Sequence, residues 1–180
     1  MKEELLKKIP EIQRITDEGI REKTIAAFLD AMQTGGWKVS DLDRIPFSLL
    51  IADNPISFLM HTRAVTAVAL ESAKILNETY EKQFQIDMDI LLSGAILHDV
   101  GKLLEYKETS KGFVKSDYGR VMRHPFSGAG LALKHGLPGE VQHIIATHAH
   151  EGDGGYRTPA SVVVHYADFM NFDPLRGLIK

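Results

Sequence analysis

A histidine and an aspartate stand side by side at the end of an apolar stretch of this sequence. The segment 88–97 is nearly all apolar, and His98, Asp99 and, after Val100 and Gly101, Lys102 follow it. A helix that is apolar on every side usually lies in the centre of a core, where an unpaired imidazole and carboxylate would be costly to bury. A divalent cation would remove that cost by coordinating both side chains. The alternative is that His98 and Asp99 lie at an exposed helix end and cap it.

Further candidate ligands lie on either side of this pair. His61 falls in the first turns of a predicted helix, where a solvated position is the alternative. Asp168 lies in an apolar helical segment, where a lone carboxylate would be costly. His124 stands at a predicted helix start, and His148 ends the apolar run 144–147. Taken alone, neither His124 nor His148 can be told apart from a structural histidine.

In their order, these residues resemble the H…HD…D signature of the HD superfamily of metal-dependent phosphohydrolases. The segment 98–102 (HDVGK) is similar to the HD-x-G-K form of the HDIG and HD-GYP branches, in which two further histidines precede the last aspartate. His124 and His148 occupy that interval, and the segment 123–128 (RHPFSG) resembles the family's segment around the first of them. The resemblance covers about residues 58–172.

The resemblance implies two metal sites that share one carboxylate. All the implied ligands are imidazole or carboxylate groups: His61, His98, Asp99, Asp168, His124 and His148. The first four would hold one ion, and Asp99 would bridge to a second ion, completed by the last two. Such ligands suit Fe, Mn, Zn, Ni or Co, as one or two divalent ions. A metal-bound hydroxide would then attack phosphorus, while the metals offset charge on the phosphoryl oxygens.

Three polar residues outside this ligand set are expected to meet the substrate. Lys102 lies one helical turn after the His-Asp pair, and the resemblance implies that its ammonium contacts a phosphate or orients the nucleophile. The alternative for Lys102 is a solvated cation near a helix C-terminus. Arg123 is placed near the mouth of the site, where it would attract phosphate, and His150 is placed in a loop that faces the substrate. His165, on the Asp168 face of its helix, is either a support for the site or a satisfied core histidine.

The chain also departs from the branches it resembles. HD-GYP proteins usually have adjacent histidines where this chain has an alanine after His148, and no proline follows Tyr156 in the loop 151–159. These departures argue against cyclic-di-GMP hydrolysis, and the lack of a KH-like segment or coiled coil argues against RNA cleavage of the ribonuclease Y kind. The segment 147–153 resembles the HxHxD motif of metallo-β-lactamase-like hydrolases, but that motif needs a many-stranded fold, and side chains at i and i+2 of a helix diverge.

Helical periodicity dominates the elements that must position these residues. Apolar residues recur at helical spacing in seven predicted helices: 3–15, which is kinked at Pro10 or begins near it, about 16–35, 56–80, 88–97, 125–135, 140–148 and 159–172. Thr16 and Asp87 are the predicted N-terminal caps. The polar segment 104–120, with Gly112 in a turn, predicts a small hairpin or an ordered loop, and 53–55 marks a break. The expected fold is an all-α HD-domain helical bundle, with room for one small β-hairpin.

Length and composition place these helices in one domain. The chain has 180 residues, 44 % of them apolar and 25 % charged, with a formal net charge of −3, which is ordinary for one globular domain. We expect a single domain over 1–180, with an HD core at 56–172. Residues 1–55 would be a helical cover, whose role as core cover, site cap or homodimer contact stays open.

The charge and composition also restrict which partners we expect. The charge argues against a nucleic-acid partner, and the lack of cysteine excludes disulfides and thiolate metal sites. We expect no membrane partner, since there is no signal region and no apolar run of roughly 18–20 residues. A cytoplasmic location is the simplest expectation.

The predicted function is hydrolysis of a phosphomonoester or phosphodiester, in a nucleotide or a similar small phosphorylated metabolite. Two other classes stay open. A non-catalytic sensor module could keep a metal or nucleotide site without turnover. Some proteins of the HD fold use a diiron centre for oxygenation, and the ligand set alone does not separate that chemistry from hydrolysis.

Overall fold

The computed structural model describes residues 1–51 and 55–178, and helices make up most of this part of the chain. The α-helices span Lys2–Lys8 (α1), Glu18–Gly35 (α2), Phe58–Thr79 (α3), Met88–Leu97 (α4), Lys102–Glu105 (α5), Asp117–Val121 (α6), His124–Lys134 (α7), Gly139–Thr147 (α8) and Pro159–Leu178 (α9). Three 3-10 helices span Pro10–Arg14 (η1), Val39–Asp43 (η2) and His150–Gly152 (η3). The expected all-α bundle with one small hairpin is confirmed.

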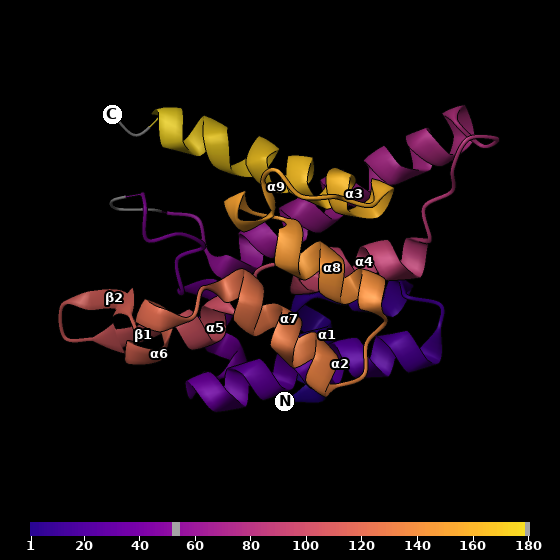
Figure 1. Ribbon diagram of the computed structural model, residues 1–180. Helices are drawn as coiled ribbons and strands as arrows, with labels where there is room; N and C mark the ends of the chain where they lie inside the picture. Colours follow the sequence, from indigo (N-terminus) through magenta and orange to yellow (C-terminus); the bar gives the residue numbers. More distant parts are fainter. Residues whose placement is uncertain (52–54, 179–180) are drawn as a thin grey trace.

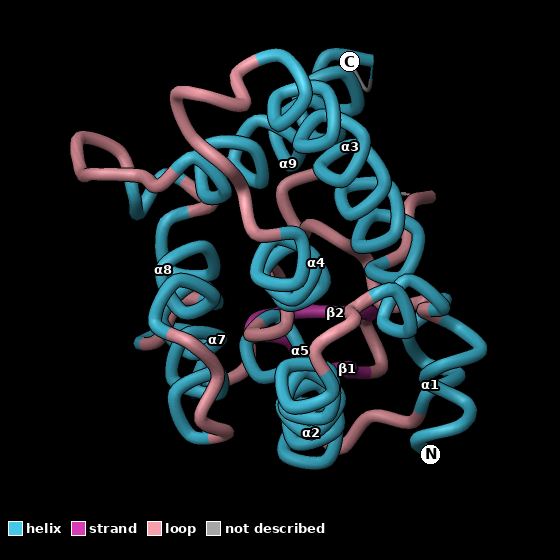
Figure 2. Tube along the Cα trace, turned by 90° about the vertical axis from the view of Figure 1, so that its right-hand side faces the viewer, coloured by secondary structure: helices cyan, strands magenta, loops and turns pink. Residues whose placement is uncertain are grey.

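Helix α4 lies in the middle of the bundle, with α3, α8, α9 and α2 around it (Figure 2). Every residue from Ile90 to Leu97 is buried, as its apolar composition requires. Asp87 caps the helix as predicted, since its side chain accepts hydrogen bonds from the backbone N–H groups of Asp89 and Ile90. Gly94 allows α8 to come close, because a Cβ there would lie 2.7 Å from a methyl carbon of Ile144. The C-terminal ends of α4 and α8 are therefore held next to each other.

The start of α2 differs from the sequence prediction by one residue. Asp17, not Thr16, is the cap, and its Oδ1 accepts from the backbone N–H of Ile20 at 2.8 Å. The Thr16 hydroxyl and backbone N–H instead donate to Asp89, each at 2.7 Å. Thr16 therefore links the start of α2 to the first turn of α4, a long-range contact that local spacing does not reveal.

The other boundaries follow the predicted pattern, apart from one extended helix. The predicted N-terminal helix is divided at Pro10 into α1 and η1, as expected. Helix α9 continues to Leu178 rather than ending near residue 172, with Pro174 inside it. Residues 53 and 54 of the predicted break lie outside the described residues.

The polar segment after α5 forms the expected hairpin. Strands β1 (Tyr106–Thr109) and β2 (Gly112–Lys115) pair antiparallel, with Tyr106 opposite Lys115, and Gly112 has the positive φ of +102° that the turn needs. Figure 1 shows the hairpin and α6 projecting together from one side of the bundle. The hairpin brings Lys115 back beside α5.

One continuous core joins the first 55 residues to the rest of the described chain. It includes Leu5, Ile12 and Phe28 from the N-terminal segment together with Leu91 of α4 and Ile144 of α8.

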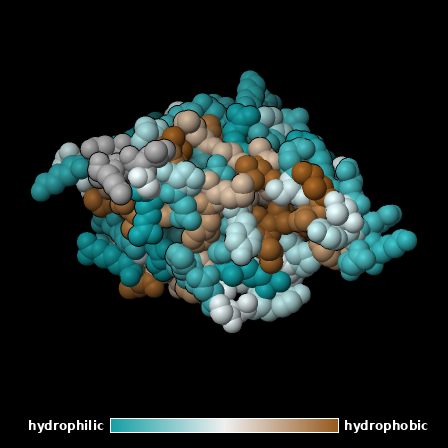
Figure 3. Space-filling view, turned by 90° about the horizontal axis from the view of Figure 1, so that it is seen from above, coloured by the Kyte–Doolittle hydropathy of each residue, from teal (hydrophilic) through white to brown (hydrophobic). Residues whose placement is uncertain are grey.

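No helix in the described part of the chain is both long enough and apolar enough to cross a bilayer. Figure 3 shows hydrophobic side chains between hydrophilic ones on the face seen from above. The exposed hydrophobic residues of α3 and α9 include Met60, Val162 and Met170.

Candidate metal centre

The turn that follows α4 carries the His-Asp pair into the centre of the molecule. His98 is fully buried and Asp99 is 1 % exposed, so the reading of this pair as an exposed helix cap is wrong. Gly101 lies against the start of α7, where a Cβ would meet the backbone oxygen of His124 at 2.2 Å. Only glycine allows this approach, which brings His124 beside the pair.

All six predicted ligands meet at this turn, although they come from five separate segments. His61 projects from α3, Asp168 from α9, His124 from the first residue of α7 and His148 from the residue after α8. His98 Nε2 lies 3.3 Å from His61 Nε2, and His124 Nε2 lies 3.3 Å from His148 Nε2. The structure therefore arranges the four imidazoles as two pairs.

Asp99 stands between the two imidazole pairs. Its Oδ2 lies 3.4 Å from the Nε2 atoms of both His61 and His98. Its Oδ1 lies 3.2 Å from His124 Nε2 and 3.5 Å from His148 Nε2. Asp168 joins the first pair only, with Oδ1 at 3.0 Å from His61 Nε2 and 4.0 Å from His98 Nε2.

Three of the imidazoles are held with Nε2 free to act as a ligand. The Nδ1–H groups of His98 and His148 donate to the backbone oxygens of Ala95 and Ile145, each at 2.7 Å. Nδ1 of His124 donates to Glu105 Oε2 at 2.9 Å. A hydrogen bond from one ring nitrogen fixes the tautomer and leaves the lone pair of the other nitrogen for a metal.

The donor atoms fit divalent cations in both spacing and chemistry. Two donors about 2.1 Å from one ion stand roughly 3.0–3.4 Å apart in octahedral or tetrahedral geometry, close to the 3.3 Å between the paired Nε2 atoms. Asp99 Oδ1 is buried and accepts no hydrogen bond from the described residues, so its lone pairs are available. His61, His98 and Asp99 form one group that could hold an ion, and Asp99, His124 and His148 form a second.

The carboxylates of the centre are ionised and two of its imidazoles are held neutral. Burial opposes ionisation of Asp168, but the hydrogen bond from His61 counters it, and the Asp168 pKa is lowered to about 2. Burial also opposes ionisation of Asp99, but the neighbouring Lys102 ammonium counters it, and the Asp99 pKa is held well below its usual range. Burial lowers the pKa of His61, and lowers that of His124 to about 4. Neutral imidazoles and ionised carboxylates are the forms that bind metals.

Lys102 is part of the buried centre rather than a solvated cation. It is 8 % exposed, and its ammonium donates to Asp99 Oδ2 at 2.6 Å and to the backbone oxygen of Phe47 at 2.7 Å. Burial opposes protonation of Lys102, but the neighbouring Asp99 outweighs it and raises the lysine pKa. The ammonium thus holds one oxygen of the shared carboxylate.

The structure places the other predicted contacts at the edge of the site. Arg123 lines the pocket beside the centre, with its guanidinium bound to Glu105 at 2.7 Å and to Glu151 at 2.9 Å. The His150 side chain, 74 % exposed, lines the same pocket and binds Asp153 through Nδ1 at 2.8 Å. His150 therefore stands apart from the buried centre.

His165 supports the centre from behind. Its Nδ1 lies within hydrogen-bonding distance of the backbone oxygen of His148. The ring is half-buried and packs against Phe169 of the same helix. His165 thus braces the backbone that carries His148, a candidate ligand, which is the supporting role that its place on the Asp168 face allowed.

Sequence reasoning missed Glu105, which holds His124 in place. This carboxylate is 1 % exposed at the end of α5, and its Oε2 accepts from both the backbone N–H (2.8 Å) and Nδ1 (2.9 Å) of His124. Its Oε1 binds Arg123 at 2.7 Å and Lys115 at 3.3 Å. These contacts outweigh the cost of burial and lower the pKa of Glu105 to about 2. The available signal was its place one helical turn after Lys102.

Phe47 was also missed, because nothing in its sequence neighbourhood indicates a contact with the centre. Its ring stacks on the His61 imidazole with 4.4 Å between centroids. Its backbone oxygen receives the Lys102 ammonium, as noted above. The segment before α3 therefore covers one side of the metal centre.

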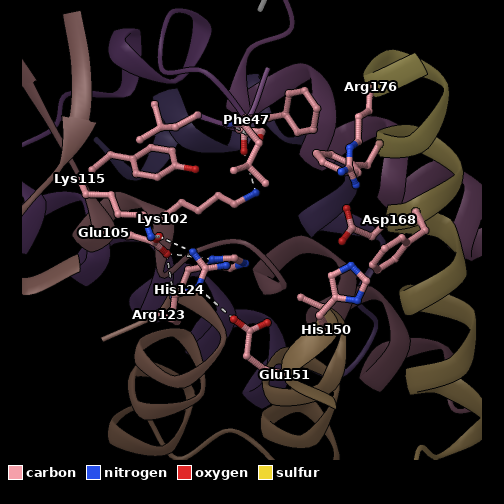
Figure 4. A pocket seen from close by; sticks show the side chains of 17 residues that line it. Phe47, Lys102, Glu105, Lys115, Arg123, His124, His150, Glu151, Asp168 and Arg176 are labelled. Atoms are coloured by element: carbon pink, nitrogen blue, oxygen red, sulfur yellow. Dashed lines mark hydrogen bonds and ion pairs between the residues drawn. The ribbon is translucent and has the colours of Figure 1, made fainter. Parts of the chain in front are cut away.

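A pocket of about 470 Å³ opens above the centre (Figure 4). Lys102, His124 and Asp168 lie at its inner end. Its walls are largely apolar, with Phe47, Leu49, Leu50, Tyr106, Phe169 and Phe172 among the lining residues. Basic and acidic side chains also line it: Lys115, Arg123, Arg176, Glu105 and Glu151.

The fold and the site together indicate a metal-binding helical protein. Its helices enclose a histidine-aspartate centre that could hold metal ions, and a pocket opens onto that centre. Residues 58–170 match the model of the HD domain, and the chain belongs to this family.

One relative is the dihydroneopterin 2',3'-cyclic phosphate phosphodiesterase of Methanocaldococcus jannaschii, with 32 % identity over 111 residues. The alignment covers 60 % of this chain and 43 % of the relative, so the chain spans less than half of the length of that protein. No solved structure matches the chain significantly.

Proposed function

We propose that this chain is a metal-dependent phosphohydrolase that cleaves a phosphate ester of a small molecule. The observation that carries the proposal is the position of Asp99, whose two oxygens each face a converging pair of imidazole Nε2 atoms. Membership of the HD family and the likeness to a phosphodiesterase support the same activity. Because the named relative acts on a 2',3'-cyclic phosphate, a small cyclic phosphodiester is the substrate class that we test first.

The residues of the centre divide into two proposed ion sites. His61, His98, Asp99 and Asp168 would hold one ion, and Asp99, His124 and His148 would hold the other. All donors are imidazole nitrogens or carboxylate oxygens, so Fe, Mn, Zn, Ni and Co are all suitable. Bound divalent cations supply an activated water and neutralise charge on phosphoryl oxygens.

The remaining residues bind and orient the reacting groups. Lys102 fixes Asp99 through Oδ2, and because the lysine also lines the pocket, its positive charge faces a phosphate held at the centre. Glu105 holds His124 by two hydrogen bonds and so sets the direction of its Nε2. The pocket volume of about 470 Å³ lies in the range of small-molecule sites. A small phosphorylated metabolite is therefore the proposed partner.

We also propose that residues 1–180 act as one domain, with the centre in 56–172 and residues 1–55 as its cover. Leu5, Ile12 and Phe28 of the first segment are fully buried in the common core. Phe47 from the same segment contacts His61 and Lys102. The N-terminal segment thus completes both the core and one wall of the site.

The test compares wild type with Asp99→Asn, measuring metal per chain and hydrolysis of a 2',3'-cyclic nucleotide, p-nitrophenyl phosphate and bis(p-nitrophenyl) phosphate. We expect metal-dependent turnover in the wild type, and loss of both metal and turnover in the variant. Asp117→Asn is the control, because the Asp117 side chain is 82 % exposed on α6. Metal-loaded wild type that cleaves none of these esters would overturn the proposal and favour a binding role. Iron-dependent oxygen uptake would favour oxygenation instead.

A further inference from the structure

Among the residues that the structure describes, four lysine and arginine side chains line the pocket, and three of them are already paired with acids. Their partners stand within the centre or at the pocket wall: Lys102 with Asp99 at 2.6 Å, Lys115 with Glu105 at 3.3 Å, and Arg123 with Glu105 at 2.7 Å and Glu151 at 2.9 Å. A paired cation has part of its charge and several of its hydrogen-bond donors committed. A ligand that binds such a cation must compete with a carboxylate.

Arg176 is the exception. It lines the same pocket, yet its side chain forms neither an ion pair nor a hydrogen bond with any residue in the described part of the chain. All five N–H donors of its guanidinium are therefore available to a ligand. Arg176 lies outside residues 58–170, which match the family model.

The geometry of α9 directs Arg176 toward the metal centre. Asp168, Phe172 and Arg176 follow one another at spacings of four residues and so share one face of the helix. The axial rise from Asp168 to Arg176 is about 12 Å, and helical side chains lean toward the helix N-terminus. Arg176 therefore leans back over Phe172 toward Asp168, and Figure 4 shows its side chain extending in that direction.

Arg176 and Asp168 line the same pocket without forming an ion pair. The Asp168 side chain is 15 % exposed at the inner end of the pocket, and its Oδ1 is 3.0 Å from His61 Nε2. Arg176 does not reach this carboxylate closely enough to form an ion pair with it. A phosphoryl group held by the centre would have the guanidinium on its open side, where Arg can bind two phosphate oxygens at once.

We propose that Arg176 is a substrate-binding residue that takes the phosphoryl oxygens of an organic phosphate, whose organic part lies against Phe169 and Phe172. This inference rests on the proposed function, because it places the phosphoryl group at the metal centre. Lys102 and Arg123, the predicted phosphate contacts, then act mainly on Asp99 and Glu105. Arg176, in the last turn of α9, supplies a cation that no described residue pairs with.

The test uses metal-loaded wild type, Arg176→Gln and Arg176→Lys. Guanosine 2'-monophosphate is the binding probe, titrated by calorimetry, and guanosine 2',3'-cyclic phosphate is the substrate for kcat and KM. We expect Arg176→Gln to weaken binding of the monophosphate and to raise KM about tenfold, with unchanged metal content, because one charge-assisted contact is lost. Arg176→Lys should fall between the two, because it restores the charge without the bidentate geometry.

Arg120→Gln is the matched control. Arg120 is an exposed arginine on α6, and it is not among the residues that line the pocket. Equal Kd and KM in wild type and Arg176→Gln would overturn the role of Arg176 and leave the proposed function intact. Wild type that binds the monophosphate through Arg176 but hydrolyses neither the cyclic phosphate nor the two p-nitrophenyl esters would overturn the proposed function and leave the role of Arg176 intact.

Discussion

Glu105→Gln should weaken the second ion site without touching any predicted ligand. The substitution keeps the size of the side chain but removes its negative charge. In the wild type, Oε2 accepts two hydrogen bonds from His124, and Oε1 accepts from Arg123. A glutamine offers only one oxygen, so its NH₂ group must face donors on one of the two sides. Either His124 loses its acceptor or Arg123 does.

The magnitude follows from the burial of this carboxylate. Glu105 is 1 % exposed, so water cannot replace the lost acceptor. Loss of the hydrogen-bond partner of a metal-binding histidine typically weakens metal affinity about 10- to 100-fold, or about 1.4–2.7 kcal/mol. We expect this loss at the site of Asp99, His124 and His148, and no comparable loss at the site of His61 and Asp168. Glu105→Ala should lose more, because it leaves no acceptor.

The assay is metal content after equilibrium dialysis against a series of free Mn²⁺ concentrations, together with calorimetric titration. Wild type should titrate with two ions, and Glu105→Gln with one ion of unchanged affinity and one weakened ion. Glu151→Gln is the matched control, because Glu151 also binds Arg123 but makes no hydrogen bond to His124. If both Glu105 variants bound two ions with wild-type affinity, the argument that Glu105 orients His124 would be refuted.

Three further predictions concern the centre and the fold. Lys102→Met should keep most of the bound metal but lower kcat at least tenfold, because Asp99 loses the 2.6 Å contact and the pocket loses a buried charge; unchanged kcat in a steady-state assay would contradict this role. Removal of metal with a chelator should lower the melting temperature by roughly 5–10 °C relative to protein with metal at 100 times its Kd, since such binding stabilises the fold by about 2.7 kcal/mol. Calorimetry with and without chelator measures this shift. An unchanged melting temperature would argue against a metal that links α3, α4, α7, α8 and α9. Urea unfolding should show one transition by both fluorescence of Trp37 and far-UV circular dichroism, because residues 1–55 share the core of the rest; two separate transitions would indicate two folding units.

The centre could be largely predicted from the sequence because burial and chemistry conflict there. The apolar helix before His98 and Asp99 predicted either a buried pair that binds a metal or an exposed helix cap. The resemblance to the HD family then added His61, His124, His148 and Asp168. Helix caps and turn residues that depend only on neighbouring residues could also be predicted. Asp87 caps α4, and Gly112 occupies the turn of the hairpin.

The rest depended on contacts between distant segments. Glu105 lies in a polar stretch that resembles a solvated loop, and only the approach of α7 makes it a buried partner of His124. The Thr16 hydroxyl donates to Asp89, 73 residues away, so Asp17 rather than Thr16 caps α2. Pro174 commonly marks a helix end, yet α9 continues through it and carries Arg176 to the pocket. Spacing along the chain does not encode any of these pairings.

The close contact at Gly101 divides the molecule into a part that resists change and a part that can vary. Any side chain at position 101 would push against the backbone oxygen of His124, which a Cβ would meet at 2.2 Å. The relation between the two halves of the centre is therefore set by main chain, and mutation has little freedom to alter it. The side chains of Phe172 and Arg176 on α9 are not fixed by a main-chain contact of this kind. Divergence among related chains should thus exchange the wall of the pocket and leave the chemistry beneath it unchanged.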